Sequence, residues 1–372
     1  MLRRLFLFLL FPLVSLFCIE GIEYYLIEVP NTSYMSTITN NQRIHVIEFD
    51  PSLFDIKLVK AIDNGLGRES VMSLSKRHNA VASINGGFFS IGGTYDGRAC
   101  GALKINEWVA LPTKPRGCIG WSCSQKSPIM DRLLVNIFIE NDSFKIPVNG
   151  LNRMQKEGEI ILFNHSFNRT TLTDPDGEEL LIVDGVIQSI KQGGSSKIPE
   201  NGYILSIQKN NPFFQKFQVG SSLEFKTEIK PLLQLTTEDE WQSSNYILGG
   251  TPLLIHNHTK ILDLESEQTI PTFLSHRHAR TAIGILPSGN WLFVVVDHTT
   301  PFDGMTIPEL TQLMEEFGCK QALNLDGGGS STMVLEGTLK NSPRGDKDEG
   351  LEDAQIRRVS DAIVIIPKDN KK

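Results

Sequence analysis

The segment from residue 291 to residue 325 limits the possible folds of this chain more than any other. Trp291–Val296 and Gln321–Leu325 are continuous apolar runs, as in strands that are buried on both faces. Between them, Thr306–Phe317 has apolar residues at helical spacing, starts with a capping box and stops before a glycine. We therefore expect a βαβ unit with a right-handed crossover, in which the two strands are adjacent and parallel.

Other short apolar runs, bounded by Gly, Asn, Asp or Pro, predict many more strands than helices. The predicted strands are Ile44–Phe49, Ile56–Ala61, Val81–Ile84, Leu134–Ile139, Glu159–Phe163, Leu180–Val183, Tyr203–Ile207, Thr281–Leu286 and Ala362–Ile366. A second, short helix is expected near Ser70–Arg77. The fold class that follows is α+β, with a mixed β-sheet core and few helices, including the C-terminal βαβ unit.

The composition of the 372 residues is that of a globular protein. Hydrophobic residues make up 40% and charged residues 21% of the chain, which excludes the disordered, collagenous and coiled-coil classes. No repeat of fixed period is visible, and no Ser-rich or Pro-rich linker divides the sequence. We therefore expect a single composite domain at 21–372, with its core at about 40–366.

The N-terminus has the pattern of a secretory signal. Arg3 and Arg4 precede the apolar run Leu5–Phe17, which is short for a membrane span and has the length of a signal h-region. Residues 1–20 are therefore predicted to be a signal peptide, and an uncleaved membrane anchor is the alternative. In both cases we expect the rest of the chain to lie outside the cytoplasm, secreted or periplasmic.

Export makes the cysteines informative, because disulfides form in extracytoplasmic compartments. Cys118 and Cys123 bracket a short loop that contains Gly120, and this spacing favours a disulfide between them. The apolar neighbours of Cys319 indicate a buried thiol. No second Cys or His pair follows at the spacing of a zinc ribbon, so neither a metal nor another cofactor is predicted.

The net charge argues against one class of partner. With 43 acidic and 36 basic residues the formal net charge is -7, unlike that of a protein that neutralises rows of nucleic-acid phosphates. An anionic substrate therefore needs a local basic site. His276 and His278, shortly before Arg280, are expected to form a basic rim of that kind.

Three predicted strands end in polar residues that are typical of a ligand site. Asp297 and Asp326 directly follow the two strands of the βαβ unit, and Asn85–Gly87 follows the predicted strand at 81–84. Ligands bind at the carboxyl ends of parallel strands. We therefore expect these three strand ends to converge.

The glycine run Gly327–Gly329, followed by Ser330, exceeds the needs of a tight turn. Glycines at positive φ let the backbone approach a ligand, and successive free N–H groups form a nest for an anion such as phosphate. No Lys follows the run as in a Walker loop, and the chain has no Gly-x-Ser-x-Gly elbow. Nucleotide binding and serine hydrolysis are therefore disfavoured, and an anion-binding role is preferred to a plain turn.

Several segments that include these strand ends have a recognisable pattern. They are INGGFF at 84–89, GGTPLL at 249–254, RTAIG at 280–284, VVVD at 294–297 and NLDGGGSSTM at 324–333. Together they resemble the phosphodiester glycosidase family, over about residues 40 to 366. Members of that family release a free sugar and a phosphomonoester from a sugar-1-phosphodiester, so the resemblance implies this reaction. Departures from the family pattern at Ala279, His298 and Ile356 concern the rim of the pocket and hence the identity of the sugar.

The implied reaction assigns a role to each candidate residue. Asp326, and after it Asp297, would act at the anomeric carbon as nucleophile or as the base that activates water. Arg280 and Arg357 would hold the departing phosphate together with the glycine amides. The candidate catalytic residues are Asp326, Asp297 and Arg280. The candidate substrate-binding residues are Asn85, Gly86, Gly87, Gly327, Gly328, Gly329, Ser330, Arg357 and His298, and no metal ligand is proposed.

The leading hypothesis is an exported hydrolase that cleaves the sugar–oxygen bond of a sugar-1-phosphodiester, on glycans of an envelope or exopolysaccharide type. Its partner is then a carbohydrate phosphodiester, without nucleic acid, and with membrane contact only if the N-terminal segment stays uncleaved. The alternative is a non-catalytic binder of anionic glycans that uses the same pocket. A phosphodiesterase that attacks phosphorus is disfavoured, because it usually needs a metal pair held by His and Asp residues.

Overall fold

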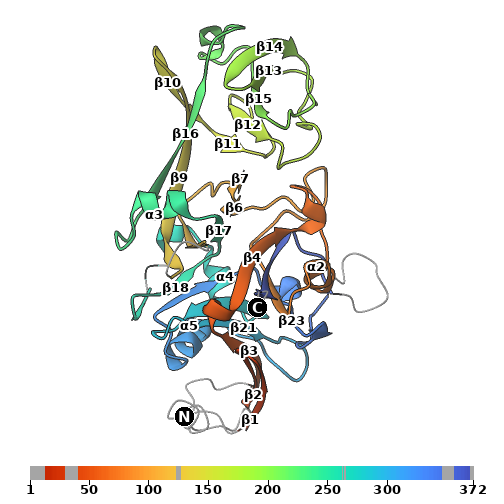
Figure 1. Ribbon diagram of the computed structural model, residues 1–372, viewed down its shortest axis with the longest axis vertical. Helices are drawn as coiled ribbons and strands as arrows, with labels where there is room; N and C mark the ends of the chain where they lie inside the picture. The colour runs from red at the N-terminus through yellow and green to blue at the C-terminus, as the bar shows by residue number, and fades with distance from the viewer. Residues whose placement is uncertain are drawn as a thin grey trace.

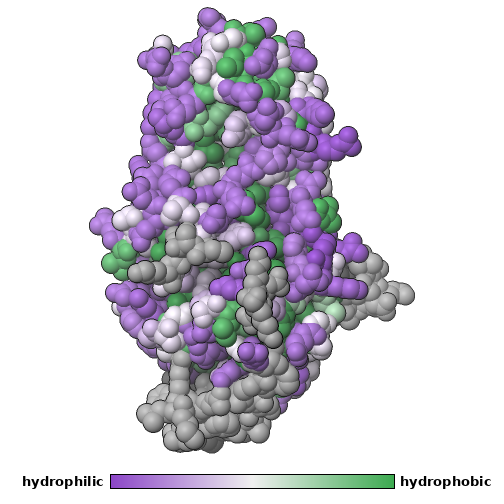
Figure 2. Space-filling model, in the orientation of Figure 1, coloured by the Kyte–Doolittle hydropathy of each residue, from purple (hydrophilic) through white to green (hydrophobic). Residues whose placement is uncertain are grey.

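The structure is a computed structural model that describes residues 13–29, 41–122, 127–261, 263, 265–345 and 356–368. Within these ranges, four β-sheets and four short α-helices form an elongated molecule (Figure 1). The helices are α2 (Val71–Arg77), α3 (Glu238–Ser243), α4 (Pro271–Ser275) and α5 (Ile307–Glu316). The surface in the same orientation is mostly hydrophilic, with small apolar areas between polar ones (Figure 2).

Sheet 1 has eight strands, and each is antiparallel to its neighbours. In spatial order they are β1 (Leu13–Ile19), β2 (Ile22–Val29), β3 (Gln42–Phe49), β21 (Trp291–Val296), β20 (Arg280–Ile285), β22 (Gln321–Asn324), β18 (Leu253–His256) and β19 (Thr259–Lys260). Sheet 4 has five strands, in the order β24 (Thr338–Leu339), β23 (Met333–Leu335), β5 (Ala82–Asn85), β25 (Asp361–Pro367) and β4 (Phe54–Lys60).

Sheets 2 and 3 are built from the middle of the chain, and in Figure 1 sheet 3 lies at one end of the long axis. Sheet 2 runs β10 (Phe144–Val148), β9 (Ile129–Asn141), β8 (Arg116–Trp121), β17 (Tyr246–Gly249), β6 (Leu103–Ile105) and β7 (Glu107–Ala110), and β16 (Glu224–Pro231) also pairs with β9. Sheet 3 runs β11 (Gly150–Leu151), β12 (Ile161–Asn164), β15 (Gly202–Ile207), β13 (Glu178–Val183) and β14 (Val186–Gln192).

Local sequence patterns predicted these elements well. Eight of the nine predicted apolar runs contain most of a strand, and the ninth, Leu134–Ile139, lies within the longer strand β9. The predicted helix at 306–317 is α5, with Thr306 as its N-cap and Glu309 completing the capping box. Buried residues of α5, such as Leu310 and Leu313, pack on one face of sheet 1. The short helix predicted near Ser70 is α2, capped by that serine.

The predicted pairing of β21 with β22 is wrong. Both strands pair antiparallel with β20, which lies between them, so they run in the same direction but are not adjacent. The reason is the tight turn at 286–290, where Leu286 N–H donates to the Asn290 carbonyl at 2.9 Å. This turn makes a hairpin of β20 and β21. The chain then continues through α5, and β22 pairs with the other edge of β20.

The two faces of sheet 1 bury different cores. Phe293 and Val295 of β21 belong to a core shared with sheets 2 and 4, whereas Val294 and Val296 pack with α5. Side chains alternate between the two faces of a strand, so the cores that contain these four residues show to which face the next residues of the strand point. It therefore also orients the residues at the ends of β20 and β21.

The predicted disulfide does not form at Cys118, which is a free and fully buried cysteine. The prediction placed residues 119–122 in a loop, but residues 119–121 belong to the extended strand β8. The Cys118 side chain points into the core shared by sheets 2 and 3, which also holds Trp241. Cys123 lies outside the described residues. Cys319 is free and buried, in agreement with its apolar neighbours.

The described N-terminal segment overlaps the predicted signal peptide. Its strand β1, at Leu13–Ile19, pairs with β2 in an antiparallel hairpin. Signal cleavage after residue 20 would remove β1, so the signal peptide stays a prediction. In the part of the chain that the structure describes, no helix is long and apolar enough to cross a membrane.

Candidate functional site

The loop after β22 is the centre of the candidate site. Asp326 N–H donates to the Gly86 carbonyl at 3.2 Å, and Gly328 N–H donates to the Ala279 carbonyl at 2.8 Å. A single 3-10 turn, Gly328–Ser330, then leads to sheet 4. The loop is therefore tied both to the end of β5 and to the start of β20, and two of the three predicted strand ends do converge.

Asn85 positions this loop. Its side-chain oxygen accepts hydrogen bonds from the Thr281 hydroxyl at 2.8 Å and from Thr332 N–H at 3.1 Å. Its amide nitrogen donates to the Asp326 carbonyl at 2.8 Å. Asn85 has 0% exposure, so its amide is committed to joining β5, β20 and the Asp326 loop. The structure thus gives Asn85 a positioning role, where the sequence suggested a contact with substrate.

Most of the predicted glycine amides are also committed within the protein. Gly327 N–H donates to the Asp326 carboxyl oxygen Oδ1 at 2.9 Å, and Gly87 N–H donates to Asp361 Oδ1 at 2.8 Å. A Cβ added to Gly86 would collide with the same Asp361 oxygen. Among the residues that the structure describes, Gly329 N–H has no hydrogen-bond partner. The expected nest of three free amides is therefore reduced to one.

Asp326 is a carboxylic acid held in a partly accessible but strongly desolvated position. Burial raises its pKa to about 6, and the nearby carboxylate of Asp361 raises it further, whereas Ser330, Gly327 N–H and the charge of Arg357 oppose the rise. An acid with a pKa this close to neutrality can change its protonation state during a reaction at physiological pH. Asp326 therefore remains the first candidate for chemistry.

Asp361, at the start of β25, is an acid of the site that the sequence reasoning missed. Its exposure is 1%, and burial raises its pKa to about 6. Oδ2 accepts a hydrogen bond from the Ser360 hydroxyl, while Oδ1 binds Gly87 N–H. The signal available in the sequence was an acid directly before the apolar run 362–366, whereas Asp297 and Asp326 directly follow their apolar runs.

Arg357 is the arginine that lies at the glycine run. A Cβ on Gly329 would stand 2.7 Å from the guanidinium carbon of Arg357, so the side chain passes directly over this glycine. Its positive charge lowers the pKa of the Asp326 carboxyl and so opposes the rise caused by burial. Arg358 is exposed, so the preference for Arg357 over its neighbour is supported by their positions.

Arg280 is built into the scaffold. Its exposure is 1%, and its guanidinium donates to three backbone carbonyls, those of Met305 at 2.8 Å, His276 at 2.8 Å and Phe273 at 3.1 Å. Burial lowers its pKa to about 10. A guanidinium with this many fixed partners holds the segment around α4 against the start of α5, so the bidentate phosphate contact predicted for it is not supported.

Asp297 is enclosed on the other side of sheet 1. It has 0% exposure, accepts from Ser342 N–H at 2.9 Å, and lies 3.2 Å from His45 Nε2. The other ring nitrogen of His45 lies 2.9 Å from the Tyr24 hydroxyl, whose pKa is raised to about 12 by burial and by Asp297. Asp297 thus belongs to an internal Tyr–His–Asp chain, in which its carboxylate already has partners.

A basic rim forms beside the loop, as the sequence suggested. The rings of His276 and His278 are 6.4 Å apart, those of His278 and His298 are 6.2 Å apart, and Arg344 lies 3.4 Å from His298. Burial, and then the surrounding positive charges, lower the pKa of His278 and of His298. Within the described residues no group of His, Cys, Asp or Glu is arranged to hold a metal ion. The lowered pKa values leave the His278 and His298 rings mostly uncharged at neutral pH, so the positive charge beside them comes from Arg344.

A cavity of about 270 Å³ is lined in part by Phe88, which lies two residues after Gly86, the residue whose carbonyl accepts from Asp326 N–H. Its lining includes the rings of Phe88 and Phe273, the Arg116 side chain, Thr251 and Cys100. Gly87 and Gly249 pack closely together between this cavity and Asp361. A Cβ on Gly87 would stand 3.1 Å from the Gly249 carbonyl oxygen. Aromatic rings with a few polar groups are the usual lining of a sugar or small-molecule site. We refer to this space as the Phe88 cavity.

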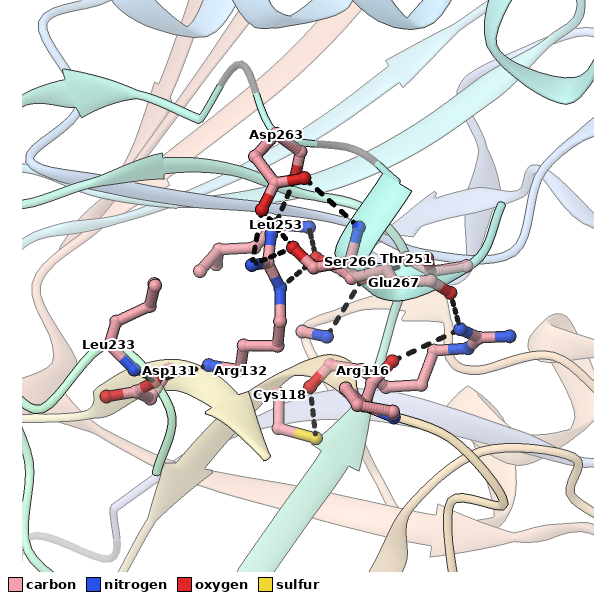
Figure 3. A network of polar contacts seen from close by, with 12 residues as sticks. Arg116, Cys118, Asp131, Arg132, Leu233, Thr251, Leu253, Asp263, Ser266 and Glu267 are labelled. Carbon is pink, nitrogen blue, oxygen red and sulfur yellow. Dashed lines mark hydrogen bonds and ion pairs between the residues drawn. The ribbon is translucent and has the colours of Figure 1, made fainter. Parts of the chain in front are cut away.

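Arg116 is a second residue that the sequence reasoning missed, and a buried network fixes it at the cavity wall (Figure 3). The Glu267 carboxylate accepts from Thr251 Oγ1 at 2.9 Å, Leu253 N–H at 2.9 Å and Arg132 Nε at 3.3 Å. The backbone carbonyl of Glu267 accepts from Arg116 Nη1. Glu267 has 0% exposure, so it acts as an internal anchor for the cavity wall.

Solved structures of other proteins share this fold. A hypothetical protein from Synechocystis superposes with a TM-score of 0.80 at 22% identity, covering 96% of this chain and 64% of that one. A putative exported protein from Burkholderia pseudomallei superposes with a TM-score of 0.73 at 22% identity, covering 88% of this chain and 74% of that one. At these identities the likeness concerns the fold alone.

Two curated relatives share sequence with this chain. An uncharacterized protein of Rickettsia conorii is 29% identical over 239 residues, which is 60% of this chain and 78% of that protein. The mouse N-acetylglucosamine-1-phosphodiester alpha-N-acetylglucosaminidase is 32% identical over 106 residues. That match covers 26% of this chain and only 20% of the mouse enzyme.

The family comparison includes most of the site described above. The model of the phosphodiester glycosidase family matches residues 176–366, just over half of the chain. This range contains the Asp326 loop, Arg357, Asp361, Arg280 and the basic rim. The family model thus covers the sequence motifs that form the candidate site. The chain belongs to the phosphodiester glycosidase family.

Proposed function

We propose that this protein is an exported hydrolase that cleaves the sugar–oxygen bond of a sugar-1-phosphodiester and releases a free sugar and a phosphomonoester. The observation that carries this proposal is the Asp326 carboxyl, which is partly accessible, has a pKa near neutrality and is faced by Arg357. Membership of the phosphodiester glycosidase family supports hydrolysis of phosphodiester-linked sugars as the reaction class.

Asp326 acts at the anomeric carbon in this proposal. The bond from that carbon to the phosphate oxygen breaks, the electron pair leaves with the phosphate, and positive charge develops on the sugar ring. The Asp326 carboxylate either attacks the anomeric carbon or takes a proton from the water that does. A phosphomonoester is a good leaving group, so the departing oxygen needs charge stabilisation more than it needs a proton.

The departing phosphate is held by groups that face the loop. Arg357 supplies a guanidinium that can bind two phosphate oxygens, and the unpaired Gly329 N–H can bind a third. His278 and His298 add positive charge at the rim when they are protonated. Asn85 holds the backbone of Asp326 in place during these steps and does not itself touch the substrate.

The sugar occupies the Phe88 cavity in this proposal. The rings of Phe88 and Phe273, in edge contact at 6.0 Å between centroids, offer an apolar surface to the sugar ring. Arg116 and Thr251 supply polar groups to the same lining. N-acetylglucosamine is the first sugar to test, because the mouse relative is named for its 1-phosphodiester.

Hydrolysis in water enriched in heavy oxygen tests the proposal directly. If water adds to the anomeric carbon, the released sugar carries the label and the phosphomonoester does not. The sugar must be analysed at once, because free reducing sugars exchange this oxygen with solvent. Label in the phosphomonoester would contradict the glycosidase mechanism, and binding of the substrate without any turnover would favour the alternative, a non-catalytic binder of anionic glycans.

Export and an envelope or exopolysaccharide glycan as substrate remain part of the proposal. Export rests on the N-terminal signal pattern, and a neighbour with the same fold is described as a putative exported protein. Fractionation of the native host, with the N-terminus of the recovered protein sequenced, tests it. A cytoplasmic protein that retains residues 1–20 would contradict it, and a mature N-terminus near residue 21 would mean that β1 is absent from the working protein.

A further inference from the structure

A second and larger cavity lies beside the Phe88 cavity. Its volume is about 610 Å³, compared with about 270 Å³ for the first. Its lining includes Ser90, Tyr95 and Arg98 and the segment 111–114. Parts of β9, β10 and β11 and the turn at 153–159 complete it. These elements meet where the long strands β9 and β10 approach sheet 3 (Figure 1). We call this space the Lys114 cavity.

The two cavities adjoin each other at two places. Ser90 and Arg98 line the Lys114 cavity, and their side chains lie 3.3 Å and 3.7 Å from the sulfur of Cys100, which lines the Phe88 cavity. In the second place, Lys114 and Arg116 are two residues apart and line the larger and the smaller cavity respectively. The two cavities are therefore separated by only a few residues.

The charges of the Lys114 cavity differ from those of the whole protein. The chain has a formal net charge of -7, yet this cavity is lined by Arg98, Lys114, Arg153 and Lys156 and by a single acid, Glu159. Glu159 is engaged by Arg153, with distances of 2.6 Å and 2.9 Å between their side chains.

The other three cations form no salt bridge with a carboxylate in the described part of the chain. The Arg98 guanidinium donates only to the Ala99 carbonyl and to the Cys100 sulfur. Lys114 and Lys156 are exposed. Four cations and one acid leave an excess of positive charge around this hollow, and in an acidic protein such a concentration favours the binding of an anion.

From this arrangement we infer that the Lys114 cavity binds the aglycone, the group attached to the far side of the scissile phosphate, and that this aglycone is a glycan with an anionic group of its own. The inference rests on the proposed function, which places the sugar in the Phe88 cavity. It assigns the substrate class: an anionic glycan that carries a sugar in 1-phosphodiester linkage, from which the sugar is released while the phosphate stays on the glycan. Its anionic group can be a phosphate or a carboxylate, because lysine and arginine bind both.

Three substrates that share one sugar-1-phosphate and differ in the aglycone test the inference. The aglycones are a neutral hexose, a hexose phosphate and a hexuronate. We expect kcat/KM to be about tenfold higher for at least one charged aglycone than for the neutral one, and this advantage to shrink in high salt. A gain with hexose phosphate alone identifies phosphate as the recognised group, and a gain with hexuronate alone identifies the carboxylate.

Charge variants locate the effect. Lys114→Glu with Lys156→Glu should abolish the advantage of the charged aglycone and change kcat/KM for the neutral substrate by less than about twofold. Lys191→Glu makes the same kind of change at an exposed position of β14 outside both cavities, and should keep the advantage. If the double Glu variant folds poorly, Lys114→Gln with Lys156→Gln removes the charges without reversing them.

A binding measurement separates this inference from the proposed function. The probe is an oligosaccharide that carries the preferred anionic group but no scissile phosphodiester, titrated calorimetrically into the full protein and into the double variant. Equal kcat/KM for all three substrates, unchanged in the variants, would overturn the inference and leave the hydrolase intact. Binding that the double variant loses, without turnover of any substrate, would support the cavity and overturn the hydrolase. If the probe does not bind and no substrate is turned over, both the inference and the proposed function are overturned.

Discussion

Arg280 and Asp297 sit side by side at the ends of β20 and β21 but project from opposite faces of sheet 1. Arg280 pairs with Val296 across the two strands, and its side chain reaches Met305 and Phe273 on the face covered by α5. Asp297 is directed to His45 on the face that carries Val295. Both side chains are buried and hydrogen-bonded within the protein, so Asp326, Asp361 and Arg357 are the first candidates for the chemistry.

Asp326→Asn is expected to abolish turnover. The amide cannot attack the anomeric carbon or accept a proton from water, so kcat should fall by at least about a thousandfold. Measured with an N-acetylglucosamine 1-phosphodiester, KM should change much less than kcat. Retention of more than about a tenth of the wild-type kcat would remove Asp326 from the reaction and leave Asp361 as the acid to examine.

The pH dependence should report the carboxyl pair Asp326 and Asp361. The pKa of each is raised to about 6 by burial, and the reaction needs Asp326 in its ionised form. The value of kcat/KM should therefore rise with pH through an apparent pKa of about 6 and fall about tenfold per pH unit well below it. A profile that is flat between pH 5 and pH 7 would contradict this assignment.

The same raised pKa predicts a stability effect with a definite sign. The folded protein holds the Asp326 proton more tightly than the unfolded chain does, so this contribution to stability is complete below about pH 4 and is lost as the pH rises through about 6. Asn carries no charge to bury. Asp326→Asn should therefore stabilise the fold by about 1–2 kcal/mol at pH 8, a figure reduced for the partial accessibility of the carboxyl, and by almost nothing at pH 4.

Denaturant unfolding of wild type and variant at the two pH values measures this difference. Asp142→Asn, a change at an exposed surface position, serves as the control and should show no comparable gain at pH 8. A variant that is less stable than wild type at both pH values would show that the Asp326 carboxyl supports the fold.

Arg280→Lys should damage stability more than catalysis. An ammonium group cannot replace the planar guanidinium that serves the carbonyls of Met305, Phe273 and His276, so the free energy of unfolding should fall by about 2–4 kcal/mol. Arg357→Lys should show the opposite, with kcat/KM reduced about a hundredfold and the melting temperature nearly unchanged. Arg358→Lys, at an exposed site, is the matched control.

Comparison of the three variants decides the role of Arg280. The kinetics must be measured at a temperature where Arg280→Lys is folded, as judged by its melting curve. An Arg280→Lys protein with unchanged melting temperature and a strongly raised KM would show that Arg280 binds the phosphate after all.

Thiol labelling should distinguish the cysteines. Cys100 is exposed and should react with iodoacetamide in the native protein, whereas Cys118 and Cys319 are buried, and burial raises the pKa of the Cys118 thiol well above its usual value. In denaturant without reductant, Cys118 should also become alkylated, because it is not in a disulfide. Peptide mass spectrometry reads each site, and a Cys118 peptide that reacts only after reduction would restore the predicted bridge with Cys123.

The sequence by itself determined the parts of this protein that depend on neighbouring residues. Alternating and continuous apolar runs located the strands, and the capping box at Thr306 located the start of α5, because these signals act over a few residues of the same segment. The acid and glycines of the Asp326 loop were found in the same way, as polar residues placed directly after an apolar strand.

The tertiary structure alone decided which of these residues are available to a substrate. Asn85 is separated from Asp326 by 241 positions in the chain, Arg116 from Glu267 by 151, and Gly87 from Asp361 by 274, yet each pair shares a hydrogen bond. The sequence shows that a side chain can donate or accept, but its partner is chosen by how the sheets pack. For that reason Arg280, Asp297 and most glycine amides have partners inside the protein that the sequence did not reveal, and Asp361 and Arg116 are recognised as candidates only in the folded chain.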